Sequence, residues 1–415
     1  MTTRPRRLVL LIISHLVAIR SNTRCSFKGS CEKNALGESR DVASILTSLR
    51  VNMSLSVQLA TQKEQEQSWL QWHAVWGTHR SRDYHLRRLR FLSQLEFNQH
   101  HRKVYILRST EEKSYDKTTI LCSGDLITRP CLYRPPYTCD VLNKEITAIA
   151  SIYTPPEHRR KGFAAYIVKH LRQFSQNDEH VVASCLYSNV GPDYYQKHGE
   201  YYKHTVYRIM ATSSMLSSMA CFHDQVRPVY YADLPRLLDE NYHRLFHELQ
   251  KSSLSPYPKI TVLPTLDAIQ SVLHSETIPD DNITPPSPLP QDLLVGARIA
   301  SQSGDEFMSG FFLWCLPSRD QHLGILHYHY NSMQEAQLLL QAAQCVAQNH
   351  NFDRVALWLS REHEGDLENW SKLPGVVQVN PEDDKEVVPA LAWLYDTNFI
   401  GKEVEWRCNH LFTWV

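Results

Sequence analysis

Hydrophobic and polar residues alternate with two different periods between residues 53 and 212, and these periods predict an order of helices and strands. Trp69, Trp72 and Trp76 repeat at the spacing of one helix face, behind a capping box formed by Thr61 and Glu64. A second, basic helix is expected over residues 81–95. Strand-like apolar runs follow at residues 104–108, 120–128, 131–133 and 146–153. Two helices followed by antiparallel strands indicate an α+β fold.

The strand at residues 146–153 leads into a loop that is suited to bind an anion. This loop, residues 159–164, is called the cradle loop below; it carries three basic residues, and Gly162 lets the backbone approach a phosphate. The apolar spacing of Ile167, Val168 and Leu171 with Ala164 predicts a helix that starts at the loop. The first N–H groups of a helix are unpaired, and its dipole favours negative charge. The sequence therefore predicts a phosphate site that differs from the dinucleotide and nucleoside triphosphate loops.

A second block with candidate chemistry follows this helix. Residues 181–187 are typical of a short buried strand, and residues 193–199 predict a helix that carries Tyr194 and Tyr195. Residues 201–209 then predict a strand that closes the sheet.

The chain after residue 212 predicts a linker and a second domain. Residues 230–249 have the spacing of an amphipathic helix, and residues 275–292 contain five prolines, which exclude a helix or a sheet ladder. From residue 293 we expect a second half with the order strand, strand, helix, strand, at residues 308–316, 323–330, 335–350 and 354–360. Closing strands are expected around Trp393, Phe399, Trp406, Phe412 and Trp414. The cradle loop has the pattern Arg159-x-x-Gly162-x-Ala164. This pattern does not follow a strand in the second half, so the second half is interpreted as non-catalytic.

The bulk composition sets limits on the class of protein. A chain of 415 residues with 42% hydrophobic residues can form two domains with buried cores. Lys and Arg number 44, as do Asp and Glu, so the net charge gives no reason to expect a nucleic-acid or membrane partner. The ten cysteines lack a CxxC pair, which favours reduced thiols in a cytoplasmic protein.

Residues 1–52 allow three interpretations. Arg4, Arg6 and Arg7 precede a short apolar run, as in a secretory signal, and the absence of acidic residues before Glu32 also permits a mitochondrial presequence. The interpretation we favour is an extension outside the fold.

Two motifs together resemble the GNAT acetyltransferase superfamily. They are Arg159-x-x-Gly162-x-Ala164, which resembles its acetyl-CoA pyrophosphate loop, and Tyr194-Tyr195-x-x-x-Gly199, which resembles the helix beside the cofactor thiol. The runs at residues 153–162 and 186–192, with a looser likeness over residues 53–415, are similar to the fungal lysine N6-acetyltransferases. The chain has Gly199-Glu200-Tyr201 where that family usually has Gly-Phe or Gly-Trp.

The resemblance implies a fold, a set of domains and a cofactor. The fold would be a GNAT acyltransferase fold with a second, GNAT-like C-terminal domain. The domains would be an extension (1–52), a catalytic domain (53–212), a linker (213–292) and a non-catalytic domain (293–415). The cofactor would be acetyl-CoA, with no metal, bound by Ile152, Tyr153, Arg159, Arg160, Lys161, Gly162, Phe163, Ala164, Ser188 and Tyr195.

Transfer of an acetyl group from acetyl-CoA to an amine requires that the amine has lost its proton, because an ammonium with a pKa near 10.4 is not a nucleophile. Asp125 and Glu145 are the candidate bases. A backbone N–H near Ile152 or Tyr153 is the candidate donor to the oxyanion. The resemblance implies that Tyr195, or Tyr194 in its place, protonates the CoA thiolate. The carboxylate of Val415 is a further candidate base, by analogy with enzymes of doubled layout.

The sequence allows several acceptors and a second class of function. The acceptor is expected to be a small-molecule amine, with free L-lysine first and a polyamine or a peptide N-terminus as alternatives; the oligomeric state is left open. A catalytically silent module that binds acetyl-CoA is the alternative from another class. The pairs His243 with His247 and His327 with His329 have metal-ligand spacing, yet packed or surface histidines are the favoured interpretation. Cys185 is interpreted as a buried apolar residue.

Overall fold

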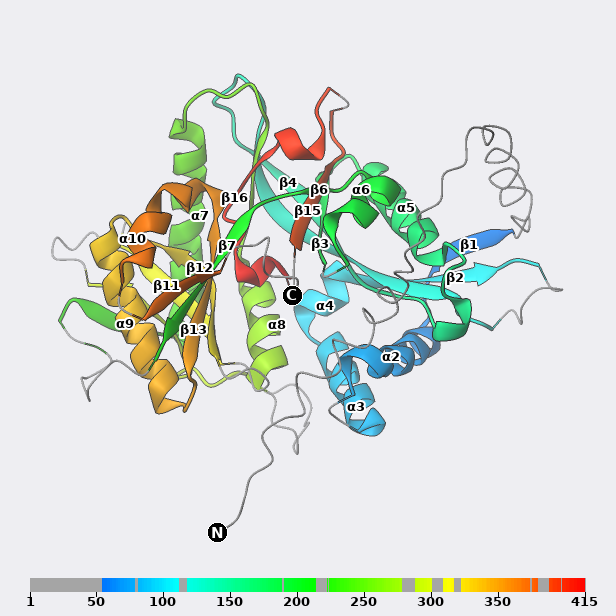
Figure 1. Ribbon diagram of the computed structural model, residues 1–415, viewed down its shortest axis with the longest axis horizontal. Helices are drawn as coiled ribbons and strands as arrows, with labels where there is room; N and C mark the ends of the chain where they lie inside the picture. Colours follow the sequence, from blue (N-terminus) through cyan, green and yellow to red (C-terminus); the bar gives the residue numbers. More distant parts are fainter. Residues whose placement is uncertain are drawn as a thin grey trace, which may run out of the picture. The chain divides into compact units, whose positions relative to one another are not determined.

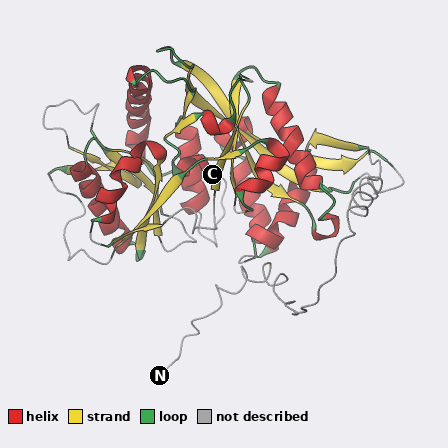
Figure 2. Cartoon of the chain, turned by 45° about the horizontal axis from the view of Figure 1, so that its top comes forward, coloured by secondary structure: helices red, strands yellow, loops and turns green. Residues whose placement is uncertain are grey.

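The computed structural model describes residues 54–78, 81–111, 118–188, 190–213, 222, 224–277, 288–300, 309–316, 322–373, 375–379, 388–396 and 398–414. These residues belong to one compact unit, Ser54–Val415, whose helices and strands are shown in Figures 1 and 2. The predicted extension at residues 1–52 and the candidate base Val415 lie outside the described residues.

The first sheet contains nine of the described strands, in the order β1-β2-β3-β4-β5-β15-β6, with β9 paired to β3 and β16 paired to β9. Their bounds are β1 Leu55–Leu59, β2 Arg102–Ser109, β3 Cys122–Arg134, β4 Leu142–Tyr153, β5 Val181–Ser188, β6 Tyr202–Lys203, β9 Lys259–Val262, β15 Val388–Trp393 and β16 Glu405–Arg407. Strands β4 and β5 are parallel, and helix α5 (Phe163–Gln176) connects them and packs on β3, β4 and β5.

The second sheet contains seven described strands in the order β14-β7-β13-β12-β11-β10-β8. Their bounds are β7 Val206–Thr212, β8 Val226–Tyr230, β10 Leu294–Ile299, β11 Phe311–Cys315, β12 His322–His329, β13 Arg354–Ser360 and β14 Val376–Val379. Its parallel pair, β12 and β13, is connected by helix α9 (Met333–Asn349), which repeats the arrangement of β4, α5 and β5. The second GNAT-like half expected from the sequence is therefore present.

The other helices frame the two sheets. They are α2 Gln62–Trp76, α3 Arg82–Ser93, α4 Glu96–His101, α6 Pro192–Gly199, α7 Leu234–Lys251, α8 Leu266–Thr277 and α10 Leu367–Ser371. Short 3-10 turns are η2 Pro156–His158, η3 Tyr231–Asp233, η5 Arg361–Asp366, η6 Gly401–Glu403 and η7 Leu411–Trp414. The capping box that predicted α2 is formed, since the Thr61 N–H donates to Glu64 Oε2 at 2.7 Å. Ser81 caps α3 by accepting from the Tyr84 N–H at 3.1 Å. None of the helices in the described parts of the chain is long and apolar enough to span a membrane.

Three predictions about strands are wrong. The strand expected to close the first sheet after residue 201 is divided: β6 stays in the first sheet, but β7 pairs with β13 and β14 of the second. In exchange, β15 from the C-terminal half pairs with β5 of the first sheet. The two runs expected at residues 120–128 and 131–133 form the single strand β3, and Phe412 lies in turn η7 rather than in a closing strand. The division at residue 212 therefore separates segments of sequence but does not separate the two sheets.

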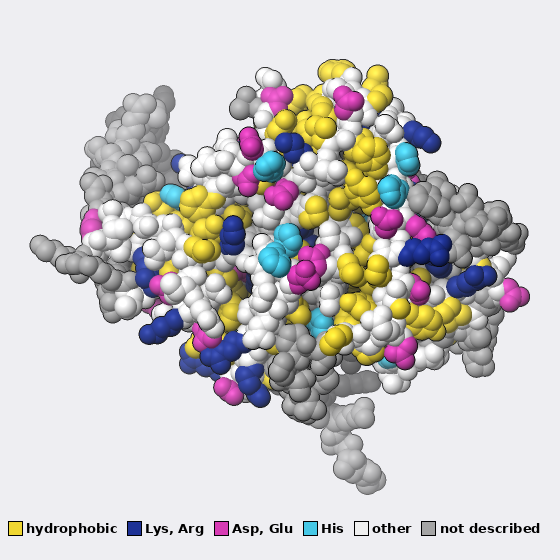
Figure 3. Space-filling view, turned by 180° about the vertical axis from the view of Figure 1, so that it is seen from behind, with side chains coloured by type: hydrophobic (Ala, Val, Ile, Leu, Met, Phe, Trp, Pro, Cys, Tyr) yellow, Lys and Arg dark blue, Asp and Glu magenta, His cyan; other side chains and the backbone are white. Residues whose placement is uncertain are grey.

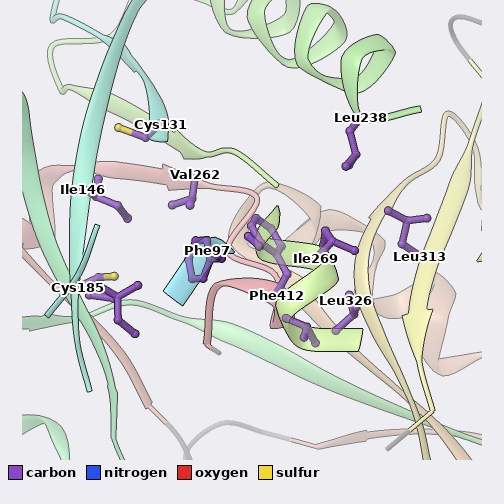
Figure 4. Close-up of a cluster of buried hydrophobic side chains, with 14 of the residues drawn as sticks. Phe97, Cys131, Ile146, Cys185, Leu238, Val262, Ile269, Leu313, Leu326 and Phe412 are labelled. Carbon is purple, nitrogen blue, oxygen red and sulfur yellow. The ribbon is translucent and has the colours of Figure 1, made fainter. Parts of the chain in front are cut away.

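One buried apolar cluster joins the two sheets. Helix α8 contacts α4 on one side and β11 on the other, so it lies between the halves. Figure 4 shows Phe412 and Ile269 between side chains of the first sheet (Cys131, Ile146, Cys185) and of the second (Leu313, Leu326). Phe412 is fully buried, and burial of such a side chain contributes about 1.5–3 kcal/mol. The C-terminal segment is thus part of the core that holds the halves together.

The expectation that all cysteines are reduced is wrong for Cys345, which is disulfide-bonded. Cys122, Cys131, Cys139, Cys185, Cys315 and Cys408 are free thiols. Cys185 is fully buried, and its burial raises the pKa of the thiol to about 12, which agrees with its interpretation as a core residue.

The surface in Figure 3 carries basic and acidic side chains interspersed on the face shown.

Candidate active site

Strands β4 and β5 separate at their carboxyl ends. Their last paired residues are Ile149 and Leu186, although β4 continues to Tyr153 and β5 to Ser188. Beyond that point β5 pairs only with β15, on its other edge. We call this region, where the ends of β4 and β5 are no longer paired with each other, the splay.

A β-bulge in β4 forms one side of the splay. Ser123 and Asp125 of β3 pair with Tyr153 and Ala150, so the two residues between Ala150 and Tyr153 lie opposite Gly124 alone. One of them, Ser151, has φ of +53°, a left-handed conformation that few non-glycine residues adopt. Such a bulge turns backbone groups out of the ladder. It lies at Ser151 and Ile152, where the sequence predicted the oxyanion donor.

Gly124 leaves room for the Ile152 side chain of this bulge. A Cβ atom at position 124 would lie 2.4 Å from Ile152 Cδ1, closer than real carbon atoms approach, whereas the nearest backbone atom of the bulge strand, the Ala150 carbonyl oxygen, would lie at an ordinary 3.6 Å. A side chain at position 124 would therefore require the end of the Ile152 side chain to turn away.

The cradle loop leads directly into α5, as predicted. Gly162 is the N-cap of α5 with φ of +83°, and a Cβ added there would meet nothing within 4 Å. Space outside this glycine is therefore open to a ligand. No acidic residue lies in the first turn of α5, so its positive dipole end keeps its attraction for anions.

The basic side chains of the cradle loop are exposed. Arg159 donates from Nε to the Thr154 carbonyl at 3.1 Å, and its guanidinium lies 5.9 Å from the Tyr153 ring centroid. Arg160 and Lys161 are exposed as well. The side chain of Phe163 is buried against His158, so only its backbone could contact a phosphate. Tyr153 is likewise buried.

Tyr195 of α6 lies at the β5 side of the splay. Its side chain is 8% exposed, and its hydroxyl is hydrogen-bonded to Ser188, the last residue of β5. Burial raises the pKa of the Tyr195 phenol, while the Ser188 hydrogen bond opposes that shift. A phenol that stays protonated can donate a proton to a leaving group. Its neighbour Tyr194 is half-buried and packs on His198, with ring centroids 4.8 Å apart.

The two candidate bases have different positions. Asp125 pairs with Ala150 beside the bulge, and its carboxylate is completely buried. Arg102 donates to Asp125 Oδ2 from Nε at 3.0 Å and from Nη2 at 2.5 Å. Asp125 Oδ1 has no hydrogen-bond partner among the described residues. Arg102 therefore fixes Oδ2 of Asp125, while Oδ1 is the oxygen that could accept a proton.

Glu145 lies at the opposite end of β4. It pairs with Pro130 and Val181, seven residues before Ile152, which is roughly 23 Å along a strand. The prediction that Glu145 is a base at the splay is therefore wrong.

A third side of the splay comes from the C-terminal segment, which the sequence did not single out. The Tyr187 hydroxyl, near the end of β5, donates to Asn409 Oδ1 at 2.6 Å and is also hydrogen-bonded to Thr413. Cys122 and Thr154, which are hydrogen-bonded at 3.3 Å, flank the bulge and were missed too. Such residues have no local motif, because only the pairing of distant strands brings them to the splay.

In the equivalent region of the second half, a buried tyrosine side chain connects the ends of the parallel strands. The β12–β13 pairing ends at Ile325 and Leu357, and beyond it the Ser360 N–H donates to the Tyr328 hydroxyl at 3.2 Å. Ser332 is the N-cap of helix α9, and its hydroxyl accepts from the Glu335 N–H at 3.2 Å. Where α5 offers an uncovered glycine, α9 has a side-chain cap and an acidic first turn.

Comparisons with known proteins agree with this geometry. Residues 211–415 match the family model of the LYC1 GNAT-like C-terminal domain. A protein of Enterococcus faecalis V583, described as a probable N-acyltransferase, has a similar structure with a TM-score of 0.51 and 11% identity; the match covers 83% of this chain and 73% of that one. No curated protein sequence matches the chain significantly.

Two further solved structures have lower scores. A GCN5-related N-acetyltransferase of Kribbella flavida has a TM-score of 0.49 at 14% identity, with 83% of this chain and 72% of that chain covered. The N-myristoyltransferase of Saccharomyces cerevisiae, solved with myristoyl-CoA, has a TM-score of 0.45 at 12% identity, with 81% and 78% covered.

The parallel pair with a β-bulge at its unpaired end and the cradle loop belong to a GNAT fold with two GNAT-like halves, and together with the family match they support a GNAT-superfamily acetyltransferase. Within that superfamily the chain resembles the LYC1 family, whose C-terminal domain model its second half matches. The fold class expected from the sequence is thus confirmed. An acetyltransferase of this kind acts on a small-molecule or peptide acceptor.

Proposed function

We propose that the protein transfers an acetyl group from acetyl-CoA to the N6 amine of free L-lysine. The observation that carries this proposal is the splay of β4 and β5, which is bordered by an uncovered helix start on one side and by Tyr195 on the other. In the corresponding region of the second half the Tyr328 hydroxyl accepts from the Ser360 N–H, and α9 is capped by Ser332. One acetyl-CoA per chain follows, bound in the first half.

The cradle loop would bind the pyrophosphate of acetyl-CoA. Backbone N–H groups at the start of α5 and the exposed Arg159, Arg160 and Lys161 would supply the donors, and Gly162 would let them approach. The pantetheine arm would then run into the splay, in place of the missing β4–β5 pairing. This orientation directs the thioester toward the bulge at Ile152 and toward the Tyr195 and Ser188 hydroxyls.

Transfer would proceed by direct attack of the amine on the thioester carbon. The tetrahedral oxyanion would accept a hydrogen bond from backbone that the bulge frees near Ile152. Collapse breaks the carbon–sulfur bond, and Tyr195 would give its proton to the CoA thiolate. The attacking ammonium must first lose a proton, for which Asp125 is the remaining described candidate.

Lysine as the acceptor rests on sequence likeness. The runs at residues 153–162 and 186–192 are similar to the fungal lysine N6-acetyltransferases, and the second half matches the LYC1 model. The hydrogen-bonded group of Tyr187, Asn409 and Thr413 is the candidate site for the polar end of the amino acid.

Release of CoA thiol from acetyl-CoA, measured over a panel of amines, tests this proposal. We expect release with L-lysine and none with lysine blocked at N6. Lysine blocked at its α-amine, a polyamine and a peptide with a free N-terminus distinguish the other acceptors. If CoA thiol is released with only one of these compounds, that compound and not free lysine identifies the acceptor class. No release with any amine, in a protein that still binds acetyl-CoA, would show a silent binding module instead.

A further inference from the structure

Three metal-ligand side chains meet beside the second sheet. Glu362 comes from turn η5, and Cys408 and His410 come from the C-terminal segment. A ligand atom from each lies within 4.8 Å of the other two. None of these residues belongs to the splay or to the cradle loop.

His410 is held in one orientation by two aromatic neighbours. It is 1% exposed, and its ring stacks on Tyr328 with centroids 4.0 Å apart. Its Nδ1 lies 2.7 Å from Nδ1 of the buried His327, so one of the two nitrogens must carry the shared proton. His410 Nε2 is buried and has no hydrogen-bond partner in the described parts of the chain. If Nδ1 of His410 carries the proton, Nε2 keeps a lone pair for a metal, as in metal sites whose histidine is oriented by an outer partner.

A tight turn brings Cys408 and His410 together. Cys408 has φ of +51°, and its carbonyl accepts from the His410 N–H at 2.8 Å. The Cys408 N–H donates to Glu362 Oε1 at 2.6 Å, which fixes the Glu362 side chain next to the turn. The three ligands are therefore positioned by backbone contacts that exist without a metal.

The set of donor atoms selects the kind of ion. Thiolate and imidazole suit zinc and similar transition metals, whereas calcium and magnesium prefer sites made of oxygen alone. Ligand atoms around a tetrahedral zinc lie roughly 3 to 4 Å apart, so a small movement of the side chains would close the site. A bound dication would stabilise the thiolate form of Cys408, which is the form that binds a metal.

We propose that Glu362, Cys408 and His410 bind a zinc ion, with His327 as the outer partner of His410 and a water in the fourth position. Thiolate and carboxylate would together neutralise the charge of the ion. Arg244 also lies near this cluster, and its own partner is Glu248, 2.7 Å from Nη1.

The ion would connect turn η5 to the C-terminal segment. Asn409, which lies between two of the ligands, accepts the hydrogen bond from Tyr187 at the splay. Zinc would thereby hold the C-terminal segment in place beside the candidate acceptor site. This inference differs from the sequence expectation of a protein without metal, and it does not depend on which amine is acetylated.

Titration of the metal-free full-length protein with Co²⁺ tests the site directly. Cobalt bound to a thiolate gives an intense sulfur-to-metal charge-transfer band together with tetrahedral visible bands. We expect one equivalent of cobalt to produce both and zinc to displace it. Cobalt binding without the charge-transfer band, or no binding, would overturn the proposal.

Two cysteine variants assign the band. Cys408→Ser should lose it and bind zinc at least about 100-fold more weakly, while Cys139→Ser, at an exposed free thiol, should keep both properties. His327→Gln should weaken binding about 10- to 100-fold, the usual effect of losing an outer partner. Circular dichroism of each variant shows whether it is folded. A folded Cys408→Ser protein that keeps the band would contradict the assignment.

Discussion

At the scale of single residues, Tyr195 is the candidate acid that protonates the CoA thiolate. Its phenol is buried against Ser188 at the splay, and burial raises its pKa, so it stays protonated through neutral pH. A thiol such as that of CoA has a pKa near 8.5, so its thiolate is a good leaving group. Loss of the acid that protonates it should therefore lower the rate by only a moderate factor. We expect Tyr195→Phe to lower kcat about 10- to 100-fold and to leave acetyl-CoA affinity unchanged.

The pH profile provides the control for this residue. Wild-type activity should fall at alkaline pH, above the ordinary tyrosine pKa near 10, as the phenol ionises. The Phe variant should lack this alkaline decrease. An identical profile in both proteins, or an equal effect of Tyr194→Phe, would assign the acid to another group.

Asp125 and Glu145 form a matched pair of carboxylates on neighbouring strands. Asp125→Asn keeps an acceptor for Arg102 but removes the base, so kcat should fall about 100-fold or more. Glu145→Gln should have no effect, because Glu145 lies at the far end of β4. Steady-state rates with lysine and melting curves of both variants distinguish loss of the base from loss of stability. Normal kcat in a folded Asp125→Asn protein would exclude it as the base.

At the scale of elements, Gly124 of β3 leaves room for the Ile152 side chain of the β4 bulge. A Cβ at position 124 would overlap Ile152 Cδ1, the end of a side chain that can turn away, so Gly124→Ala should lower the free energy of unfolding by about 0.5–1.5 kcal/mol. Adding Ile152→Ala removes the overlapping atom. The alanine at 124 should then cost much less in stability, which denaturant unfolding of the four proteins of the cycle measures. An equal cost in both backgrounds would show that the overlap is not the cause.

The cradle loop and α5 are the elements of the candidate site that the sequence predicted best. The cradle loop and α5 are local: a glycine, three basic residues and an apolar repeat lie within one stretch of chain. The bulge left no such signal, because it depends on a register shift between β3 and β4. Strand β9 and helix α8 were missed. The sequence prediction also divided β3 into two strands at Pro130. A proline is compatible with β3 at this position because the pairing of β3 with β9 begins only at Cys131.

At the scale of the whole molecule, the two sheets exchange strands. β7 leaves the first half for the second sheet and β15 returns to complete the first, so each sheet needs chain from both halves. Sequence alone could not show this, since β15 has an apolar pattern that fits either sheet and its partner β5 lies far away along the chain. The same distance hid the group of Tyr187, Asn409 and Thr413.

The exchange predicts that the halves do not fold separately. A fragment of residues 54–212 would expose the edge of β5 that β15 covers and much of the shared core, and should be unfolded or aggregated by circular dichroism and size-exclusion chromatography. Coexpression with residues 213–415 should restore a soluble complex. A soluble, cooperatively folding 54–212 fragment would show that the exchange is dispensable.

The most direct test of the account is acetyl-CoA binding at the cradle loop, measured by calorimetry on wild type, Gly162→Ala and Gly162→Asp. The aspartate adds a negative charge where the pyrophosphate would lie, at a cost of about 1 to 4 kcal/mol at roughly 4 Å, or about 10- to 1,000-fold in affinity. Alanine adds no charge and should cost less. The account predicts that wild type binds one acetyl-CoA and that the aspartate variant, still folded, binds it far more weakly than the alanine variant. Equal affinity in all three proteins would contradict it.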